Sequence, residues 1–521
     1  MRSLLIAYTL VNAVLYSVLL PLWEGFDEPF HFAYAQQLGN GQGLPDARTA
    51  RPSREVADSI LLAPASRAVK QNLPQVTTYS QFFAWPAERR LEARRRLLDL
   101  APELRWQHSE LLNYAAHHPP LAYIFLAVPE RLLARLSLPV RVALLRILAA
   151  VVGSLLLLAA AERLFLQLGI NDPYKSAALF CLVSSQMVWA TLAHVGNDWL
   201  AVPLAIWALV ALNLFAASPN RRNAAIAAGV LATGLLTKAY FLAFAPLIVG
   251  LCVLQKRWRE LASASVILAA LAGPWYARNL VRYGVVTGTQ ESRAGIGLSA
   301  ALRAAPSMNW LAAIGPGIRA SLWTGNNTFV TFSANTLNLM IGAILAALLM
   351  WAASRHARVE WIAVSYCALF VLALGFAAIA SHIFTRGAAS APSPWYAQVL
   401  VAPVLGLALL GASRRPKPGR FAAAMLVLVF GYVLCATYAV KLIPLYGGYE
   451  GRTSLAGVAT LYGRQWRMLA ANLDTVSLAP PPVIFVLAAL AIVLGAAQQI
   501  ILIRQIFARG QAGRSHNGIS K

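Results

Sequence analysis

The chain has 521 residues, of which 59% are hydrophobic and only 12% charged, and its mean hydropathy is +0.59. Because a soluble domain carries roughly a quarter charged residues, this composition excludes an ordinary soluble protein and predicts a helical integral membrane protein. The net charge of +24 is explained by basic cytoplasmic loops that face anionic lipid, and it does not indicate nucleic-acid binding.

Apolar stretches of the length needed to cross a bilayer recur along the whole chain. The first is expected to remain as a membrane helix, because no small-residue cleavage site of a signal peptide follows it. We predict about twelve transmembrane helices from these stretches. They lie at 3–22, 141–165, 176–195, 199–217, 223–238, 240–255, 260–277, 335–353, 359–381, 395–412, 420–441 and 482–503.

Short basic loops decide the predicted orientation, since such loops stay on the cytoplasmic side. All of them are cytoplasmic if the N-terminus is inside and if 119–138, interrupted by Glu130, lies along the membrane surface. Counting 119–138 as a span would place all of them outside, so we predict an interfacial helix there. The basic loops are Arg221-Arg222, 256–259, 355–358, 414–420 and the tail from Arg504.

The predicted fold is an all-α, polytopic membrane bundle beneath an extracytoplasmic cap of amphipathic surface helices. The cap belongs to the first extracytoplasmic loop, where 88–116 has leucines at helical spacing against charges. The predicted parts are the first helix (1–22), the first loop (23–140), helices two to seven (141–277), the second loop (278–334), helices eight to eleven (335–441), the third loop (445–480), the last helix (482–503) and a basic cytoplasmic tail (504–521).

The most informative segment follows the first helix directly and reads Trp23-Glu24-Gly25-Phe26-Asp27-Glu28-Pro29-Phe30-His31-Phe32. A cap at the membrane interface would explain one carboxylate beside aromatic anchors, but it explains adjacent Asp and Glu beside Pro and His poorly. A carboxylate held near a low-dielectric boundary has a raised pKa, which suits a general base. The segment therefore indicates an active site at the outer membrane boundary.

This acidic segment resembles a motif of the GT-C glycosyltransferases, a superfamily that includes protein O-mannosyltransferases and the aminoarabinose transferases that modify lipid A. The resemblance covers about residues 1–290, and the C-terminal third matches only in hydropathy. Many relatives have an Arg-Tyr pair near the tenth span, whereas Pro394-Trp395-Tyr396 offers the tyrosine without the arginine. Four further motifs follow in the family's order: His117-His118-Pro119-Pro120-Leu121-Ala122-Tyr123, Gly196-Asn197-Asp198, Gly234-Leu235-Leu236-Thr237-Lys238, and Pro274-Trp275-Tyr276-Ala277-Arg278-Asn279 with Tyr283-Gly284.

The resemblance implies an inverting transferase that moves a sugar from a polyprenyl-monophosphate donor to a hydroxyl acceptor outside the membrane. Asp27 is the expected general base, and Glu28 is the alternative base or orients the acceptor. Snorkelling, an interface anchor and a helix cap are the structural alternatives for Lys238, Arg278 and Asp198. The expected donor-phosphate ligands are Lys238, Arg278 and Tyr396, and the expected substrate-binding residues are His31, His117, His118, Asp198 and Arg282.

Two other classes of function stay open. A glycan polymerase or ligase with a lipid-pyrophosphate donor would use late-loop arginines such as Arg452, Arg464 and Arg467. A lipid-linked sugar transporter or flippase predicts ionisable residues in mid-span and inverted halves, and we see neither pattern. No cofactor is expected, and a divalent cation held by the oxygens of Asp27, Glu28 and Asp198 is the less favoured alternative.

We expect a multi-pass protein of the bacterial inner membrane whose active site faces the periplasm. The acceptor can be a lipid, a glycan or a protein, and the sugar is not specified by the sequence. Asn326-Asn327-Thr328 fits a glycosylation acceptor pattern, but this pattern is too common to assign a function.

Overall fold

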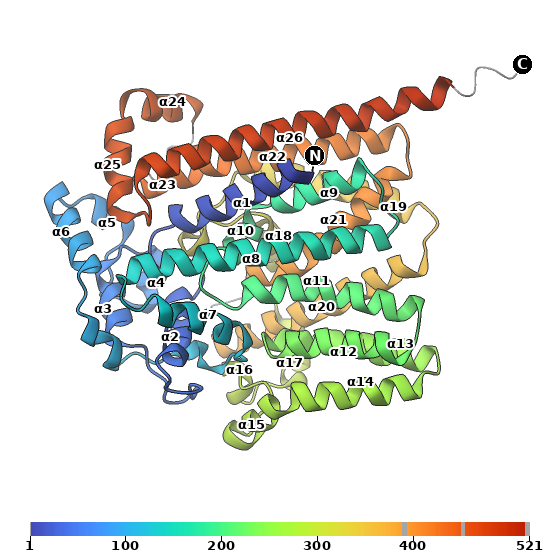
Figure 1. Cartoon of the computed structure of the whole chain (residues 1–521), viewed down its shortest axis with the longest axis horizontal. Helices are drawn as coiled ribbons and strands as arrows, with labels where there is room; N and C mark the ends of the chain where they lie inside the picture. The colour runs from blue at the N-terminus through green and yellow to red at the C-terminus, as the bar shows by residue number, and fades with distance from the viewer. Residues whose placement is uncertain (1, 388–392, 450–453, 516–521) are drawn as a thin grey trace, which may run out of the picture.

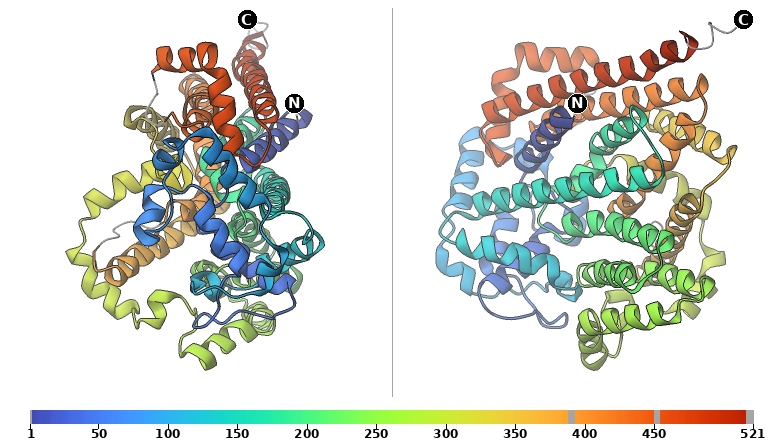
Figure 2. Two further views of the ribbon diagram at one scale, coloured as in Figure 1. Left: turned by 90° about the vertical axis from the view of Figure 1, so that its left-hand side faces the viewer. Right: turned by 45° about the vertical axis from the view of Figure 1, so that its right-hand side comes forward.

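The computed structural model describes residues 2–387, 393–449 and 454–515. In these residues the chain is helical and has no β-strand, so the predicted all-α class is confirmed. The helices form a bundle with their axes mostly aligned, and a group of shorter helices from the N-terminal quarter covers one end of it (Figure 1). A view along the bundle from that end shows this group lying across the helix ends (Figure 2).

Eight helices in the described residues are long and apolar enough to cross a membrane. A bent pair, α14 (Trp258–Leu271) and α15 (Gly273–Tyr283), makes nine if its two halves count as one span broken by 56°. The eight are α1 (Arg2–Leu19), α8 (Leu138–Gln167), α11 (Asp198–Ala217), α19 (Ala334–Ala352), α20 (Arg358–Phe384), Pro394–Ser413 with α21 (Gln398–Ser413), Pro418–Tyr446 with α22 (Pro418–Ala436), and Pro481–Ala508 within α26 (Pro481–Ser515).

The predicted count of twelve spans is not confirmed, because three of the predicted apolar runs form short or broken helices. Run 176–195 contains α9 (Tyr174–Val183) and α10 (Gln186–Leu192), and every residue of α10 is buried in protein. Runs 223–238 and 240–255 contain the 15-residue α12 (Arg221–Leu235), then η3 (Ala239–Phe244) and α13 (Ala245–Leu254). A hydropathy pattern indicates that a segment is buried in an apolar environment, but it does not show whether the segment forms one continuous helix.

The cap is formed by the chain between α1 and α8. Its last helix, α7, lies in the segment predicted as interfacial, has 12 residues and packs on α2 and α8. At 1.5 Å per residue it is too short to cross the hydrocarbon core, which is about 30 Å thick. The cap elements are α2 (Glu28–Gly39), α3 (Arg54–Leu62), α4 (Arg67–Asn72), α5 (Tyr79–Phe83), α6 (Ala87–Leu98), η1 (Pro102–Trp106), η2 (Tyr114–His117) and α7 (Leu121–Leu132).

Local capping bonds define where the short cap helices begin. The hydroxyls of Ser53 and Ser66 accept hydrogen bonds from backbone N–H groups three residues later, at the starts of α3 and α4. Thr78 and Gln81 form a reciprocal capping box at the start of α5. Helices of five to nine residues are marginal in isolation, so their positions depend on tertiary contacts.

The basic loops gather at the end of the bundle away from the cap (Figure 1). The connections that follow α11, α13, α19 and α21 carry basic residues in them or at the adjoining helix end: Arg221 at the start of α12, Arg257, Arg355 and Arg414. Two of these loops are joined directly, since Arg414 donates to the carbonyl of Arg355 at 2.9 Å and pairs with Glu360 at 2.6 Å. The bundle therefore has one basic end and one end covered by the cap, which carries the acidic motif.

Candidate active site

The acidic loop between α1 and α2 contains two residues in the left-handed backbone region, Trp23 with φ 65° and Asp27 with φ 56°. Residues other than glycine adopt this region rarely, and they concentrate at functional sites when the surrounding structure enforces it. Asp27 stands immediately before α2, whose first turn contains Pro29. The loop therefore turns sharply at Asp27 and holds its side chain in a fixed direction.

A second segment, η5 (Asn326–Thr328), holds the acidic loop in this conformation. The Asn327 side-chain amide donates to the carbonyls of Trp23 at 3.2 Å and Gly25 at 2.8 Å. The backbone N–H of Thr328 donates to Glu24 Oε1 at 2.9 Å. The role of this segment was not predicted from the sequence, where it appeared only as a common glycosylation pattern; Asn326 is fully buried.

Glu28 is committed to an ion pair with Arg146 of α8, and both side chains are fully buried. Arg146 Nε donates to Glu28 Oε1 at 2.7 Å, its Nη2 donates to the other carboxylate oxygen, and the Val195 N–H donates to Oε1 at 2.9 Å. Burial alone would raise the pKa of Glu28, but the charge and hydrogen bonds of Arg146 outweigh it and lower the pKa. Glu28 is therefore an ionised group whose oxygens are already engaged.

Asp27 has a different environment from its neighbour. One of its carboxylate oxygens accepts a hydrogen bond from the Tyr114 hydroxyl, and the residue is only partly buried. Burial raises the pKa of Asp27, while Tyr114, His194 and Lys238 act in the opposite direction. A carboxylate with a raised pKa and an exposed edge toward a cavity accepts a proton more readily than an ordinary aspartate, which suits a general base.

The Asp27 side chain lies in the wall of a cavity of about 580 Å³ between the cap and the bundle. The cavity is lined by residues of the acidic loop, of α3 and α4, and of the segments around Tyr114 and Asn327. Phe329 and Trp395 contribute aromatic rings to its wall, and this size is typical of small-molecule sites.

Lys238, Asp198 and Tyr396 come together from three separate segments. Lys238 Nζ donates to both carboxylate oxygens of Asp198, at 2.6 and 2.7 Å, and lies 4.5 Å from the centre of the Tyr396 ring. Val195, three residues before Asp198, donates its N–H to Glu28 at 2.9 Å, and Trp395, next to Tyr396, stacks on Phe26, so this group lies near the acidic loop. Three residues that were predicted from separate motifs are thus neighbours in space.

The predicted histidines form one wall of adjoining rings beside α7. His31 Nδ1 lies 2.6 Å from the Tyr123 hydroxyl, and the His31 ring stacks on His118 with centroids 5.3 Å apart. His117 follows at 4.1 Å from His118. Burial lowers the pKa of all three, to about 4 for His117 and well below the usual value for the others, so the wall is uncharged at neutral pH.

Arg278 and Arg282, both on α15, are engaged with the loop that follows α2. Arg278 Nη2 donates to the carbonyl of Pro45 at 3.0 Å, and Arg282 pairs with Asp46. Arg293 donates to the carbonyl of Ala47 at 3.1 Å. Arg278 and Arg282, which were predicted as ligands, therefore fix this loop in the structure. Lys238 and Tyr396, by contrast, lie together.

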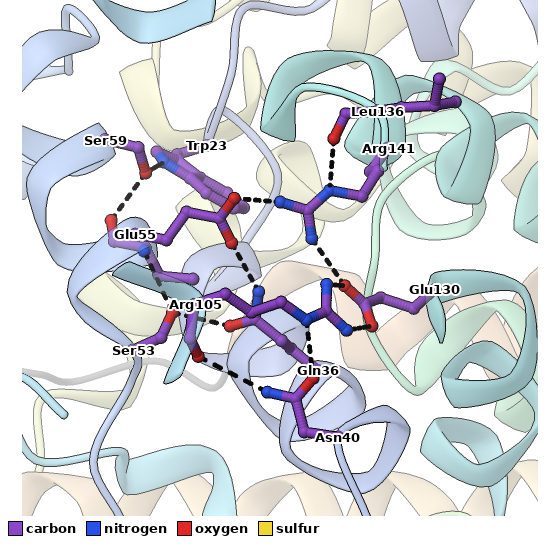
Figure 3. Close-up of polar contacts among 11 residues, drawn as sticks. Trp23, Gln36, Asn40, Ser53, Glu55, Ser59, Arg105, Glu130, Leu136 and Arg141 are labelled. Atoms are coloured by element: carbon purple, nitrogen blue, oxygen red, sulfur yellow. Dashed lines mark hydrogen bonds and ion pairs between the residues drawn. The ribbon is translucent and has the colours of Figure 1, made fainter. Parts of the chain in front are cut away.

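A buried network of two arginines and two glutamates ties the cap to the bundle (Figure 3). Arg141, near the start of α8, bridges Glu55 of α3 and Glu130 of α7, the second at 2.7 Å. Arg105 of η1 makes two bonds of 2.6 Å with Glu130, and all four side chains are at most 6% exposed. The charges are balanced, so the network can be buried without an uncompensated charge.

Sequence analysis missed Arg141, Arg146 and Tyr114. Arg146 did carry a signal, because it lies inside the predicted span at 141–165, where an arginine is costly unless it has a partner, and Arg141 stands at the start of the same span. Tyr114 carried no such signal, since tyrosine is common near membrane interfaces.

The late-loop arginines of the polymerase or ligase alternative are exposed or lie outside the described residues. Arg464 and Arg467, in α24 (Leu455–Arg464) and α25 (Trp466–Val476), are exposed, and Arg452 lies outside the described residues. No group of three or more His, Cys, Asp or Glu in the described parts of the chain is placed to hold a metal ion.

No family model and no curated protein matches the sequence. Among solved structures, ArnT from Cupriavidus metallidurans bound to undecaprenyl phosphate is similar, with a TM-score of 0.44, 14% identity, and coverage of 88% of this chain and 76% of that chain. The apo structure of the same protein has a TM-score of 0.40 and 15% identity, and covers 87% and 75% of the two chains. ArnT is an aminoarabinose transferase of the GT-C group, which the sequence motifs resemble, but a similarity this distant assigns no activity to this chain.

Proposed function

We propose that the protein is an inverting glycosyltransferase that moves a sugar from a polyprenyl-monophosphate donor to a hydroxyl acceptor at the cap end of the bundle. The observation that carries the proposal is the position of Asp27. Its carboxylate lies in the wall of a cavity under the cap, beside the Tyr114 hydroxyl and near Lys238. A base next to an acceptor cavity and a cation beyond it are what this reaction requires.

In the proposed step, the acceptor hydroxyl oxygen attacks the anomeric carbon of the donor sugar. Asp27 takes the hydroxyl proton as the new carbon–oxygen bond forms. The bond between the anomeric carbon and the phosphate oxygen breaks, and its electrons leave with the polyprenyl monophosphate. Attack opposite the leaving group inverts the configuration, and Tyr114 holds the Asp27 carboxylate in place through its hydroxyl.

Glu28 acts in this proposal as a positioning residue. Its carboxylate oxygens are engaged by Arg146 and by the N–H of Val195, and the side chain is fully buried. A general base must reach the proton that it removes, and Glu28 is directed away from the cavity into this ion pair. It secures the first turn of α2, and with it the direction of Asp27.

Lys238 and Tyr396 are the proposed contacts of the donor phosphate. The leaving phosphate gains negative charge, which a neighbouring cation and hydroxyl stabilise. Asp198 holds the Lys238 ammonium with two short hydrogen bonds and orients it. Arg278 could contribute only if its bond to the Pro45 carbonyl were replaced, so it takes a secondary place in the proposal.

The uncharged histidine wall is proposed to contact the sugar. Neutral imidazoles both donate and accept hydrogen bonds, which suits sugar hydroxyls. The wall is near Lys238, whose charge contributes to the low pKa of His31 and His118. Arg282 shapes this side indirectly by holding Asp46.

The proposed location is the bacterial inner membrane, with the cap in the periplasm. The connections from α11 to α12, α13 to α14, α19 to α20 and α21 to α22, which are rich in arginine, lie at the end away from the cap (Figure 1). Short basic loops remain in the cytoplasm, which leaves the cap and Asp27 on the outer side.

A binding screen of the whole protein in nanodiscs tests the donor class. Thermal stability is measured with polyprenyl monophosphate, with polyprenyl pyrophosphate and with plain anionic lipid. The proposal predicts selective stabilisation by the monophosphate. Selective stabilisation by the pyrophosphate would point to a polymerase or ligase, and equal effects of all three would favour a transporter.

A further inference from the structure

The cavity beside Asp27 differs in charge from the rest of the molecule. The chain contains 44 Lys and Arg against 20 Asp and Glu. Among the described residues that line the cavity, the acidic ones are Glu24 and Asp27, and none is Lys, Arg or His. The protein is strongly basic, but the described lining of the cavity that Asp27 faces contains no basic side chain.

The basic groups nearest to the cavity are engaged or directed elsewhere. Arg146 is bound to Glu28, and Lys238 is bound to Asp198. Arg67, at the start of α4, is exposed and lines a neighbouring hollow with Ser80 and Phe83. None of these three side chains is among the described residues that line the cavity.

Most of the lining is apolar or aromatic. Ile60, Val69, Leu73 and Leu111 come from the cap, and the Trp395 ring comes from the bundle side. Trp395 stacks on Phe26 with centroids 4.1 Å apart, so its orientation is fixed by the acidic loop. Such a surface gains free energy by covering the apolar body of a ligand.

We infer that the acceptor is an uncharged hydroxyl compound with an apolar body, and not a phosphorylated or otherwise anionic molecule. This inference rests on the proposed function, in which the acceptor occupies the cavity beside the base. An anion there would face the carboxylate of Asp27 at close range in a partly desolvated space, and no basic side chain of the described lining would offset the repulsion. A neutral hydroxyl carries no such penalty, and it brings the proton that Asp27 removes.

The test compares three short amphiphiles with the same six-carbon chain: hexyl glucoside, hexyl phosphate and hexylamine, which differ in head-group charge. Binding to the whole protein in zwitterionic nanodiscs is measured by titration calorimetry. The variant Ala68→Trp, which fills the cavity, is the control that subtracts partitioning into lipid, because Ala68 lines the cavity. We expect hexyl glucoside to bind at least about tenfold more tightly than hexyl phosphate, and Ala68→Trp to abolish the difference.

A second variant keeps the inference testable if Ala68→Trp fails to fold. Asn72 is exposed and lines the cavity at the end of α4, so Asn72→Lys adds a cation there at little structural cost. It is expected to raise the affinity for hexyl phosphate about tenfold and to leave that for hexyl glucoside nearly unchanged. Equal binding of phosphate and glucoside by the wild-type protein, or no gain for phosphate in Asn72→Lys, would overturn the inference.

The same preparations distinguish this inference from the proposed function. Head-group selectivity needs no donor and no turnover, so it is decided by the titrations alone. Selective stabilisation by polyprenyl monophosphate is decided by the donor screen. If the titrations show selectivity for hexyl glucoside but polyprenyl monophosphate gives no selective stabilisation, the transferase proposal fails. The cavity would then remain a site for uncharged amphiphiles.

Discussion

Replacing Glu28 by glutamine removes the counter-ion of a buried cation and leaves the shape of the side chain almost unchanged. Arg146 is fully buried and keeps its bonds to the carbonyls of Ser17, Leu20 and Pro21, at 2.8–3.3 Å. Breaking a buried ion pair by removing one partner costs about 3–5 kcal/mol. Because three carbonyl contacts remain to solvate the guanidinium, we expect a loss near the lower end, about 3 kcal/mol.

Asp27→Asn is the matched control, since it makes the same chemical change one residue away. Asparagine tolerates the left-handed backbone of position 27, and its carbonyl can still accept from Tyr114. The expected loss of unfolding free energy is below about 1 kcal/mol. The difference between the two losses of unfolding free energy distinguishes a structural role, proposed for Glu28, from a chemical role, proposed for Asp27.

Denaturant titrations of both variants in mixed micelles, extrapolated to zero denaturant, measure this contrast. Glu28→Gln should shift the midpoint clearly, and Asp27→Asn should hardly shift it. If Glu28→Gln retains wild-type stability, or if the two variants lose the same free energy, the assignment of Glu28 to the ion pair is refuted and Glu28 returns as a candidate base.

Three further changes have expected outcomes. Glu130→Ala leaves Arg105 and Arg141, two buried arginines of the cap network, without this carboxylate. The free energy of unfolding should fall by about 3–5 kcal/mol, and proteolysis within 87–98 should become faster. An unchanged rate of proteolysis there would contradict this role. Burial raises the pKa of Glu24 from 4.5 to about 8, so its stabilising effect is complete below pH 4.5 and is lost as pH rises through about 8. Glu24→Gln should flatten the unfolding free energy over that window, and an equally steep fall in the variant would argue against it. Asn327→Ala frees the acidic loop and should lower turnover about tenfold with donor affinity unchanged, whereas a pure loss of donor affinity would exclude a positioning role.

The sequence was sufficient to predict the class of fold, because a bilayer admits few alternatives to helices. It was not sufficient to count the spans. The buried helices α9 and α10 are separated by Ser184-Ser185, and α12 has only 15 residues. Such segments are apolar because protein surrounds them, and a hydropathy pattern cannot separate this environment from lipid.

Local motifs predicted several members of the candidate site, but they did not predict which residues these members contact in the folded structure. Lys238, Asp198 and Tyr396 were taken from separate motifs and are neighbours in the structure. The bond from Tyr114 to Asp27 joins residues 87 positions apart, and the Arg146 pair joins residues 118 positions apart. Nothing in the local sequence around Glu28 distinguishes an engaged carboxylate from a free one.

The central claim, that Asp27 removes the acceptor proton, is tested most directly by transfer with Asp27→Asn. Membranes that contain the natural acceptor are supplied with a polyprenyl-monophosphate-linked sugar, and release of polyprenyl phosphate is followed at saturating donor. We predict that Asp27→Asn binds the donor like the wild-type protein and releases polyprenyl phosphate about 100- to 10,000-fold more slowly. Wild-type release by Asp27→Asn would contradict the account.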